Sequence, residues 1–230
     1  MDAMASLRRH QLARLSEAGW ACVLGRPWDA QARDCLTHWA THGLPLVVTR
    51  QPPDAAAGGW VALGLPSPLR WGRRRLALQV PQAAVRGLDE FPHLAEVLPL
   101  LPASARGPVR DLLDALAAHP EAARAFGSYG WQAISGLDHV RPESDLDLSV
   151  GVDGAAHADA VACALRSFGA ERPRLDGELL FGDGAAVAWR EWADWRAGRV
   201  GSLMVRRLHG VSLQRDTAWC TCTEPSELAA

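Results

Sequence analysis

The sequence predicts an α+β protein in which a small α+β domain precedes a larger domain built from a mixed sheet with flanking helices. Of the 230 residues, 48% are hydrophobic and 22% are charged, a balance typical of a chain that can bury a sizeable core. Short strand-like runs and helical patterns alternate irregularly, and the pattern changes near residues 81–92. We therefore assign residues 1–85 to the first domain, 86–215 to the second and 216–230 to a flexible tail.

The first domain is expected to contain, after a short leading segment, a helix over residues 30–42. Asp29 can cap the start of this helix, and Gly43 can end it. The β-branched run at residues 44–49 predicts a strand. A loop rich in proline, alanine and glycine is expected at residues 51–59. Two further strands are expected at residues 60–65 and 75–80.

The second domain is expected to begin with helices punctuated by prolines. The clearest of them covers residues 105–119, where apolar side chains recur at helical spacing. A turn with glycine followed by a strand is expected over residues 126–133. A strand is expected at residues 146–150, followed by a helix at residues 156–168 that Gly169 ends. A hairpin is then expected, with strands at residues 173–181 and 186–192 on either side of the sequence GDG.

Composition excludes some classes of partner. The formal net charge of -2 provides no general attraction for nucleic acid, and no apolar run approaches the ~20 residues that span a bilayer. The five cysteines are scattered and the first ten residues do not resemble a signal peptide, so we expect a cytoplasmic protein. All basic residues except histidine are arginine, so a phosphate site must be built from guanidinium groups or backbone amides.

The most informative pattern is the alternation of acid and leucine from Asp145 to Leu148. Strand periodicity places Asp145 and Asp147 on one face and the two leucines on the other. Two close carboxylates repel each other by roughly 1 kcal/mol at ~4 Å even in water, and a divalent cation removes that repulsion. Mg²⁺ takes one or two carboxylates together with substrate phosphates. The pair therefore predicts a site for Mg²⁺ or another divalent cation.

Two further features lie close to this pair in the sequence. Gly127 and Ser128 allow backbone amides to approach a triphosphate, because glycine has no Cβ and tolerates positive φ. Arg141 leads into the acidic strand and could bind phosphate. We therefore expect Gly127, Ser128 and Arg141 to bind substrate.

Together, Gly127-Ser128, an intervening strand and the Asp145-x-Asp147 pair resemble the motif hG[GS]…DhDh of the DNA polymerase β-like nucleotidyltransferase superfamily. The interval from Ser128 to Asp145 is longer than is usual in that superfamily, and a loop or extended hairpin through residues 136–139 is expected to absorb the excess. The resemblance implies a nucleotidyltransferase-like catalytic domain over residues 86–215.

The resemblance also implies a third metal-binding carboxylate on a neighbouring strand. The hairpin offers Asp176, Glu178 and Glu191, and of these we favour Glu178 or Glu191. If Phe181 pairs with Ala186 in the hairpin, both glutamates and Asp176 share one face of it. Glu191 is equally open to a surface ion pair with a neighbouring arginine, so the choice between the two glutamates stays open.

The run from Arg70 to Arg75 contains four arginines and a tryptophan. It could contact a phosphorylated substrate or an acidic protein partner. A solvated strand edge is the alternative that we favour.

A closer resemblance covers roughly residues 25–215. The segments GSYGWQAISGL, RPESDLDL, RLDGELLF and AVAWREW occur in this order and resemble the malonate decarboxylase holo-acyl-carrier-protein synthase family. The segments LPLVVTRQPP and VALGLPSP resemble the first domain of that family. This implies transfer of 2'-(5''-phosphoribosyl)-3'-dephospho-CoA from triphosphoribosyl-dephospho-CoA to a serine of the apo acyl carrier protein subunit of malonate decarboxylase, with release of diphosphate.

Two other functions remain open. The same acidic pair would serve another nucleotidyltransferase, such as one that adenylylates a small molecule or a protein. The chain could also be a non-catalytic module that binds the carrier protein, in which case the acidic strand would have no chemical role.

Overall fold

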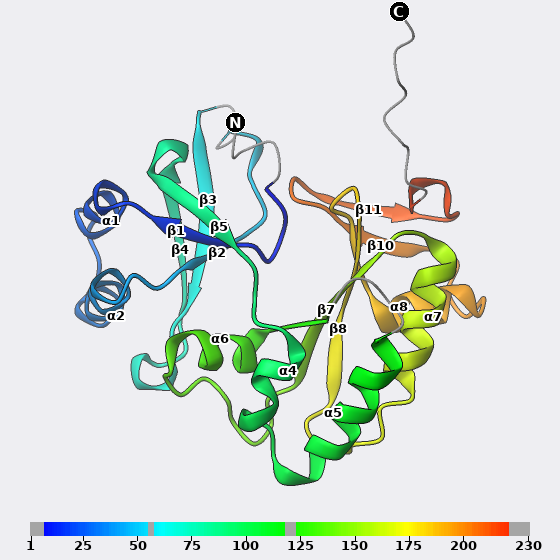
Figure 1. The fold of residues 1–230 in the computed structure, drawn as a ribbon. Helices are drawn as coiled ribbons and strands as arrows, with labels where there is room; N and C mark the ends of the chain where they lie inside the picture. Colours follow the sequence, from blue (N-terminus) through cyan, green and yellow to red (C-terminus); the bar gives the residue numbers. More distant parts are fainter. Residues whose placement is uncertain (1–6, 55–57, 118–122, 221–230) are drawn as a thin grey trace, which may run out of the picture.

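The computed structural model describes residues 7–54, 58–117 and 123–220. These residues form two sheets, one from each half of the chain, which stand side by side with helices on their outer faces (Figure 1). The predicted α+β class is confirmed. None of the helices among the described residues is long and apolar enough to cross a membrane.

The first sheet is antiparallel and has the strand order β4-β3-β2-β1-β5. Its strands are β1 (Leu12–Leu15), β2 (Leu46–Val48), β3 (Trp60–Pro66), β4 (Arg75–Pro81) and β5 (Val85–Asp89). Because β5 pairs with β1, this sheet continues four residues beyond the expected boundary at residue 85 and ends at Asp89.

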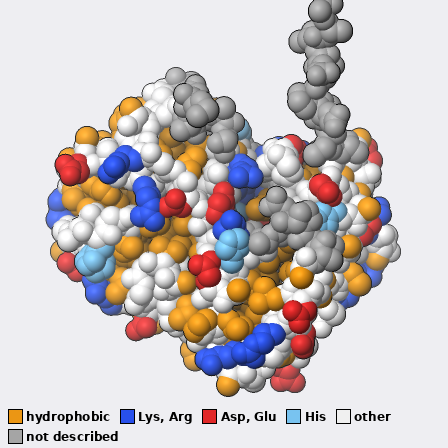
Figure 2. Space-filling model, in the orientation of Figure 1, with side chains coloured by type: hydrophobic (Ala, Val, Ile, Leu, Met, Phe, Trp, Pro, Cys, Tyr) orange, Lys and Arg blue, Asp and Glu red, His pale blue; other side chains and the backbone are white. Residues whose placement is uncertain are grey.

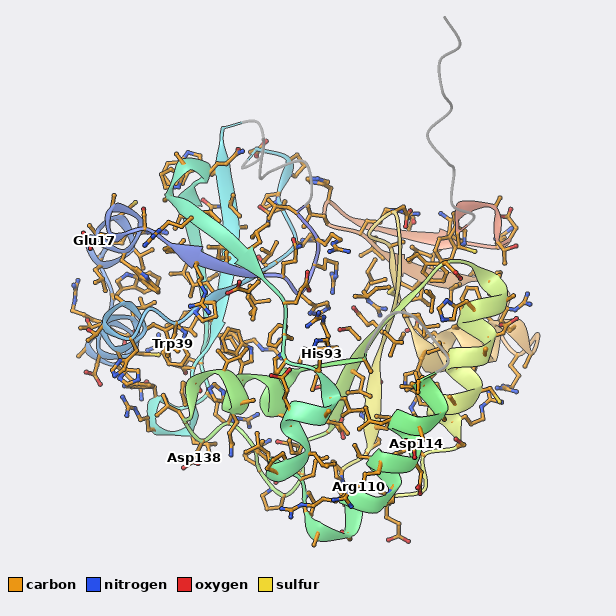
Figure 3. The ribbon with its side chains drawn as sticks, viewed as in Figure 1. Glu17, Trp39, His93, Arg110, Asp114 and Asp138 are labelled. Atoms are coloured by element: carbon orange, nitrogen blue, oxygen red, sulfur yellow. The ribbon has the colours of Figure 1, made fainter. Side chains whose placement is uncertain are left out.

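Two helices, α1 (Glu17–Leu24) and α2 (Ala30–Thr41), cover one face of the first sheet. The Asp29 side chain accepts a hydrogen bond from the Ala32 amide, so the predicted cap of α2 is confirmed. Figure 3 shows Trp39 directed from α2 into the interior, where it is fully buried. Sequence reasoning missed β1 and α1, although Ser16 caps α1 through the Gly19 amide.

The second sheet has the order β11-β10-β9-β8-β7-β6, in which β7 and β8 are parallel and the other pairs antiparallel. Its strands are β6 (Arg124–Phe126), β7 (Leu146–Val152), β8 (Leu175–Phe181), β9 (Ala186–Ala188), β10 (Leu203–Arg206) and β11 (Val211–Gln214). The remaining α-helices are α4 (Leu94–Val97), α5 (Ala103–Leu116), α6 (Gly127–Ser135), α7 (Ala155–Arg166) and α8 (Trp189–Arg196). Short 3-10 turns lie at Leu69–Trp71, Gln82–Ala84, Leu98–Leu100 and Ala218–Cys220.

The predicted helices of the second half are present with shifted ends. Apolar residues of α5 and α7 pack into a core with the leucines of β7, while Arg110 and Asp114 lie on the outer side of α5 (Figure 3). The last two residues of the helix expected over 105–119, and part of the loop expected over 51–59, lie outside the described residues.

The strand predicted over residues 126–133 is wrong, because residues 127–135 form helix α6. This helix lies between the two halves. Tyr129 enters the core of the second half, whereas Trp131 enters the core of the first. Burial on two sides removes the single apolar stripe by which a helix is recognised in a sequence.

The predicted second strand of the hairpin is also too long. It ends at Ala188, and α8 begins at Trp189 because Trp189, Trp192 and Ala193 bury themselves at helical spacing. The register differs by one residue from the expected one, since Leu180 and not Phe181 pairs with Ala186.

Two residues of the expected tail, Trp219 and Cys220, pack against the second half. Cys220 is buried, and the Trp219 ring packs edge-on against Phe181 at 4.8 Å between ring centroids. Residues 221–230 lie outside the described residues.

Candidate functional site

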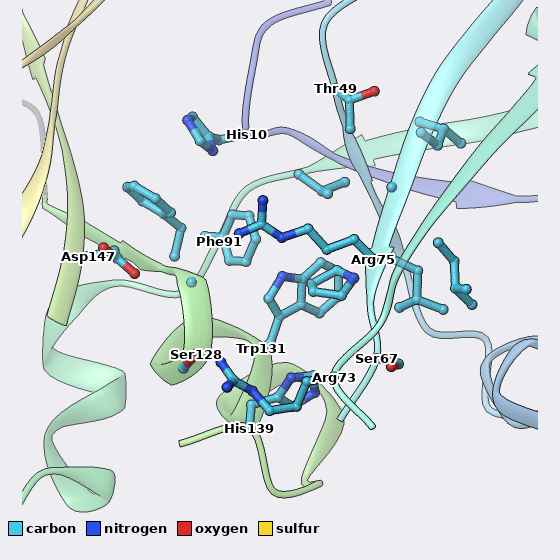
Figure 4. A pocket seen from close by; sticks show the side chains of 18 of the residues that line it. His10, Thr49, Ser67, Arg73, Arg75, Phe91, Ser128, Trp131, His139 and Asp147 are labelled. Carbon is cyan, nitrogen blue, oxygen red and sulfur yellow. The ribbon is translucent and has the colours of Figure 1, made fainter. Parts of the chain in front are cut away.

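A cavity of about 890 Å³ lies between the two halves of the molecule. The face of the first sheet that carries no helix, the start of α6 and the start of β7 line it (Figure 4). Charged side chains of both signs lie near the middle of the face shown in Figure 2, along the seam between the two halves. We take this cavity as the candidate active site.

Asp145 and Asp147 both line the cavity. Asp147 lies within β7, and Asp145 immediately precedes its first residue. Leu146 and Leu148 point the other way and are almost completely buried. The structure therefore has the alternation predicted from the sequence, with the leucines in the core and the carboxylates at the cavity.

Asp147 is in an environment that disfavours its negative charge. Burial and, after it, the negative charges of Asp176, Asp145 and Glu178 together raise the pKa of this carboxyl from 3.8 to about 7, against an opposing effect of Arg174. A buried carboxylate beside like charges favours binding of a cation.

The parallel pairing of β7 with β8 places Asp147 directly beside Asp176, and Ser149 beside Glu178. Asp176 is thus the nearest carboxylate on the neighbouring strand. Glu178 instead meets the N-terminal segment, with its Oε2 2.9 Å from Nε2 of His10 and its Oε1 3.8 Å from Arg9. The pKa of Glu178 is lowered, because the hydrogen bond from His10 and nearby positive charges outweigh its burial.

Glu191 lies elsewhere. It is on α8, outside the lining of the cavity, and its Oε1 is 3.5 Å from a guanidinium nitrogen of Arg206. The sequence-based alternative of a surface ion pair therefore describes its position, although the partner is Arg206 and not an arginine of its own helix.

Arg174 is a site residue that sequence reasoning missed. Its guanidinium donates two hydrogen bonds to Asp145, at 2.6 and 3.2 Å, and one to Asp176 at 3.3 Å. The pairing of β7 with β8 brings these residues together, and that pairing is invisible in the sequence. The only local signal is the spacing Arg174-x-Asp176 at the start of β8.

Gly127 begins α6 directly against Asp147. Its φ is +60°, and a Cβ at this position would lie 2.0 Å from Oδ2 of Asp147, so only glycine fits. Ser128 follows it and lines the cavity. Because no side chain caps the start of α6, the first amides of the helix are available to an anionic ligand.

Arg141 also lines the cavity, as expected for a residue that binds phosphate. Its guanidinium lies 2.7 Å from Glu143, and its Nε is buried without a hydrogen-bond partner among the described residues. The long interval before β7 is a loop that begins at Gly136, which ends α6 with a φ of +68°.

The residues present suit a hard divalent cation that is bound partly by its substrate. Within the described ranges, no three His, Cys, Asp or Glu side chains are grouped closely enough to hold a metal ion. Mg²⁺ commonly takes only one or two carboxylates and completes its coordination with phosphate oxygens and water. Asp145 and Asp147, with Asp176 adjacent, meet that requirement.

Two protein-family models match the chain, one for each half. The model described as the phosphoribosyl-dephospho-CoA transferase MdcG N-terminal domain matches residues 8–91, and the corresponding C-terminal domain model matches residues 93–217. No solved structure matches the chain.

Curated relatives agree with these models. A phosphoribosyl-dephospho-CoA transferase of Bradyrhizobium diazoefficiens is 36% identical over 89% of this chain and 88% of its own length. A second, from Xanthomonas euvesicatoria, is 37% identical over 80% of this chain and 85% of its own length. The chain therefore belongs to the phosphoribosyl-dephospho-CoA transferase family, and it is a transferase enzyme.

Proposed function

We propose that the enzyme transfers 2'-(5''-phosphoribosyl)-3'-dephospho-CoA from its triphosphate precursor to a serine of the apo acyl carrier protein subunit of malonate decarboxylase. The observation that carries this proposal is the position of Asp145 and Asp147 beside the start of α6, in a cavity large enough for a nucleotide. A carboxylate pair beside free helix amides suits attack on a phosphate ester.

In the proposed reaction the serine Oγ forms a bond to the α-phosphorus of the donor. The bond between that phosphorus and the oxygen bridging to the β-phosphate breaks, its electron pair leaves with diphosphate, and the serine proton passes to solvent or to a base. Catalysis of such a step depends on positioning and on stabilising the negative charge of the phosphates.

Different residues of this chain would bind the metal ion and the phosphate groups. Asp145 and Asp147 would hold Mg²⁺, which when bound neutralises phosphate charge and lowers the barrier to attack. The amides that follow Gly127 would bind phosphate oxygens at the start of α6, with the Ser128 hydroxyl as a further donor. Arg141 would bind phosphate from the loop before β7.

The test is mass spectrometry of the apo carrier protein after incubation with the triphosphate donor, Mg²⁺ and the enzyme. We expect the mass of the prosthetic group to appear on one serine, and to be lost with Asp145→Asn or Asp147→Asn. Asp114→Asn, on the outer side of α5, is the matched control. Full transfer by both active-site variants would contradict a catalytic role for the pair, and transfer of adenylate from ATP instead would assign a different donor.

A further inference from the structure

The arginine run at residues 70–75 divides into two classes in the structure. The Arg70 guanidinium lies over the Trp71 ring at 3.6 Å from its centroid, and Arg74 pairs with Asp29 at 2.6 Å. The Arg73 and Arg75 side chains have no hydrogen bond or ion pair with any described residue. Only these two of the four line the cavity. Arg73 and Arg75 are exposed, and Arg75 begins β4, the edge strand of the first sheet, so the solvated strand edge favoured from the sequence is confirmed; both side chains also line the cavity.

The backbone holds Arg73 in an unusual conformation. Its φ is +56°, in the left-handed region, directly after Gly72 at +71°. A non-glycine residue in this region costs roughly 1–2 kcal/mol. The turn is fixed by a hydrogen bond from the Arg74 amide to the Ser67 hydroxyl and by another from the Leu69 amide to the Asp138 carbonyl of the second half. The strained residue is therefore held firmly at the junction of the two halves.

The surroundings of Arg73 contain a second group without a partner. His139 is only 5% exposed, lines the same cavity, and its Nε2 has no hydrogen bond with any described residue. Burial and the charge of Arg73 lower the pKa of His139 to about 4, so its ring is neutral at pH 7. Arg73 and His139 line the cavity together with Ser128 at the start of α6 (Figure 4). The buried Nε2 is thus a polar atom whose desolvation is not offset by a hydrogen bond among the described residues, and it makes this part of the cavity polar.

Arg75 reaches the cavity from the open face of the first sheet. On this face its neighbours Gly64 and Ala77 are small and leave room for a ligand. Figure 4 shows the Arg75 side chain extending from β4 toward Phe91 and Trp131, with Asp147 on the far side of the cavity. The two unpaired guanidinium groups thus lie across the cavity from the carboxylates.

We propose that Arg73 and Arg75 bind the diphosphate part of the donor, so that the first domain supplies the site for the leaving group. The inference rests on the proposed function. Negative charge grows on the diphosphate as its bond to the α-phosphorus breaks, and guanidinium groups placed beforehand at that position stabilise it. Arginine is well suited because its planar donors match phosphate oxygens.

The experiment measures binding of inorganic diphosphate to the full-length protein by titration calorimetry in the presence of Mg²⁺. We expect Arg73→Gln and Arg75→Gln each to raise the Kd for diphosphate by roughly tenfold, the loss of one charge-assisted hydrogen bond. Arg74→Gln removes the same charge from the same run but faces away from the cavity, and we expect it to change Kd less than about twofold. Thermal unfolding of each variant verifies that it is folded.

The results separate this inference from the proposed function. Three results would each overturn the diphosphate site, whatever the transfer assay shows. They are an equal loss of diphosphate affinity in Arg74→Gln and Arg73→Gln, wild-type affinity in both Arg73→Gln and Arg75→Gln, and no diphosphate binding by the wild type. Weakened diphosphate binding confined to Arg73→Gln and Arg75→Gln would support the site even if the acceptor proves to be another protein. Arg73→Lys, which keeps the charge and loses the planar donors, is expected to fall between Arg73→Gln and the wild type.

Discussion

At the scale of single residues, the site combines an unfavourable charge with a close backbone contact. Asp147 is held where its charged form is destabilised by burial and by neighbouring carboxylates. Gly127 lies so close to it that no side chain fits between them. The unfavourable charge lowers the stability of the folded protein, and the close contact allows only glycine at position 127. Such costs are common at functional sites.

The raised pKa of Asp147 makes the metal-free protein sensitive to pH. Between pH 3.8 and about 7 the folded state keeps a proton that the unfolded state has lost, so stability falls as pH rises through this window and is then constant. We expect Asp147→Asn, which is uncharged, to be more stable than wild type at pH 8 in chelator, on the order of a few kcal/mol, and nearly equal to it at pH 4. Urea unfolding at both pH values measures this. Identical stability at pH 8 would disprove the charge argument.

Gly127→Ala should damage the site more than an ordinary left-handed glycine substitution. Its methyl group would have to displace the Asp147 carboxylate, in addition to the strain of a φ of +60°. We expect transfer to fall by at least roughly a hundredfold, because misplacement by about 1 Å has that effect. Gly136→Ala is the control, with a φ of +68° and nothing within 4 Å of the added Cβ. It should lose only about 1 kcal/mol of stability and keep its activity, measured by mass spectrometry of the carrier.

At the scale of elements, sequence patterns correctly predicted a helix cap and strands that depend only on a few adjacent residues. The cap of α2 and strands β3 and β4 were predicted correctly because a helix cap and a period of two are properties of a few adjacent residues. Helix α6 was predicted as a strand because its apolar residues face two different cores. The end of β9 was missed because burial of α8 decides where the strand stops.

The pairing of β7 with β8 contains a further element-scale constraint. Gly177 lies opposite Leu148, and a Cβ there would be 1.9 Å from the Leu148 carbonyl oxygen. We expect Gly177→Ala to lower the free energy of unfolding by roughly 3 kcal/mol or more, since the two strands that carry the acidic site would have to separate. Gly87→Ala on β5, where an added Cβ meets nothing within 4 Å, should change stability by under about 1 kcal/mol. Chemical denaturation compares the two; equal effects would contradict the steric explanation.

At the scale of the whole molecule, the two halves share α6. This helix carries Gly127 and Ser128 at the cavity and buries Trp131 in the core of the first half, where the Trp131 ring meets Phe91 edge-on at 5.5 Å between centroids. His10 and Glu178 add a second connection. The position of α6 therefore depends on the first domain.

Trp131→Ala tests this dependence. Trp131 is 3% exposed, and we expect its truncation to cost roughly 3–5 kcal/mol of stability. Transfer by the fraction that remains folded should also fall, because α6 is no longer held against the first half. Trp60→Ala, at a site that is 41% exposed, should cost under about 1 kcal/mol. Thermal unfolding with a transfer assay measures both; full activity in Trp131→Ala would show that the first half does not position α6.

The sequence by itself determined the α+β class, the acidic pair on one face of a strand and the glycine beside it, because these depend on residues that are close along the chain. Only the tertiary structure decided that Asp176 lies beside Asp147 and that Arg174 reaches Asp145, 29 positions away. It also decided which arginines of one run line the cavity. Strand register and the docking of the two halves determine these contacts, and neither is encoded in the spacing of adjacent residues.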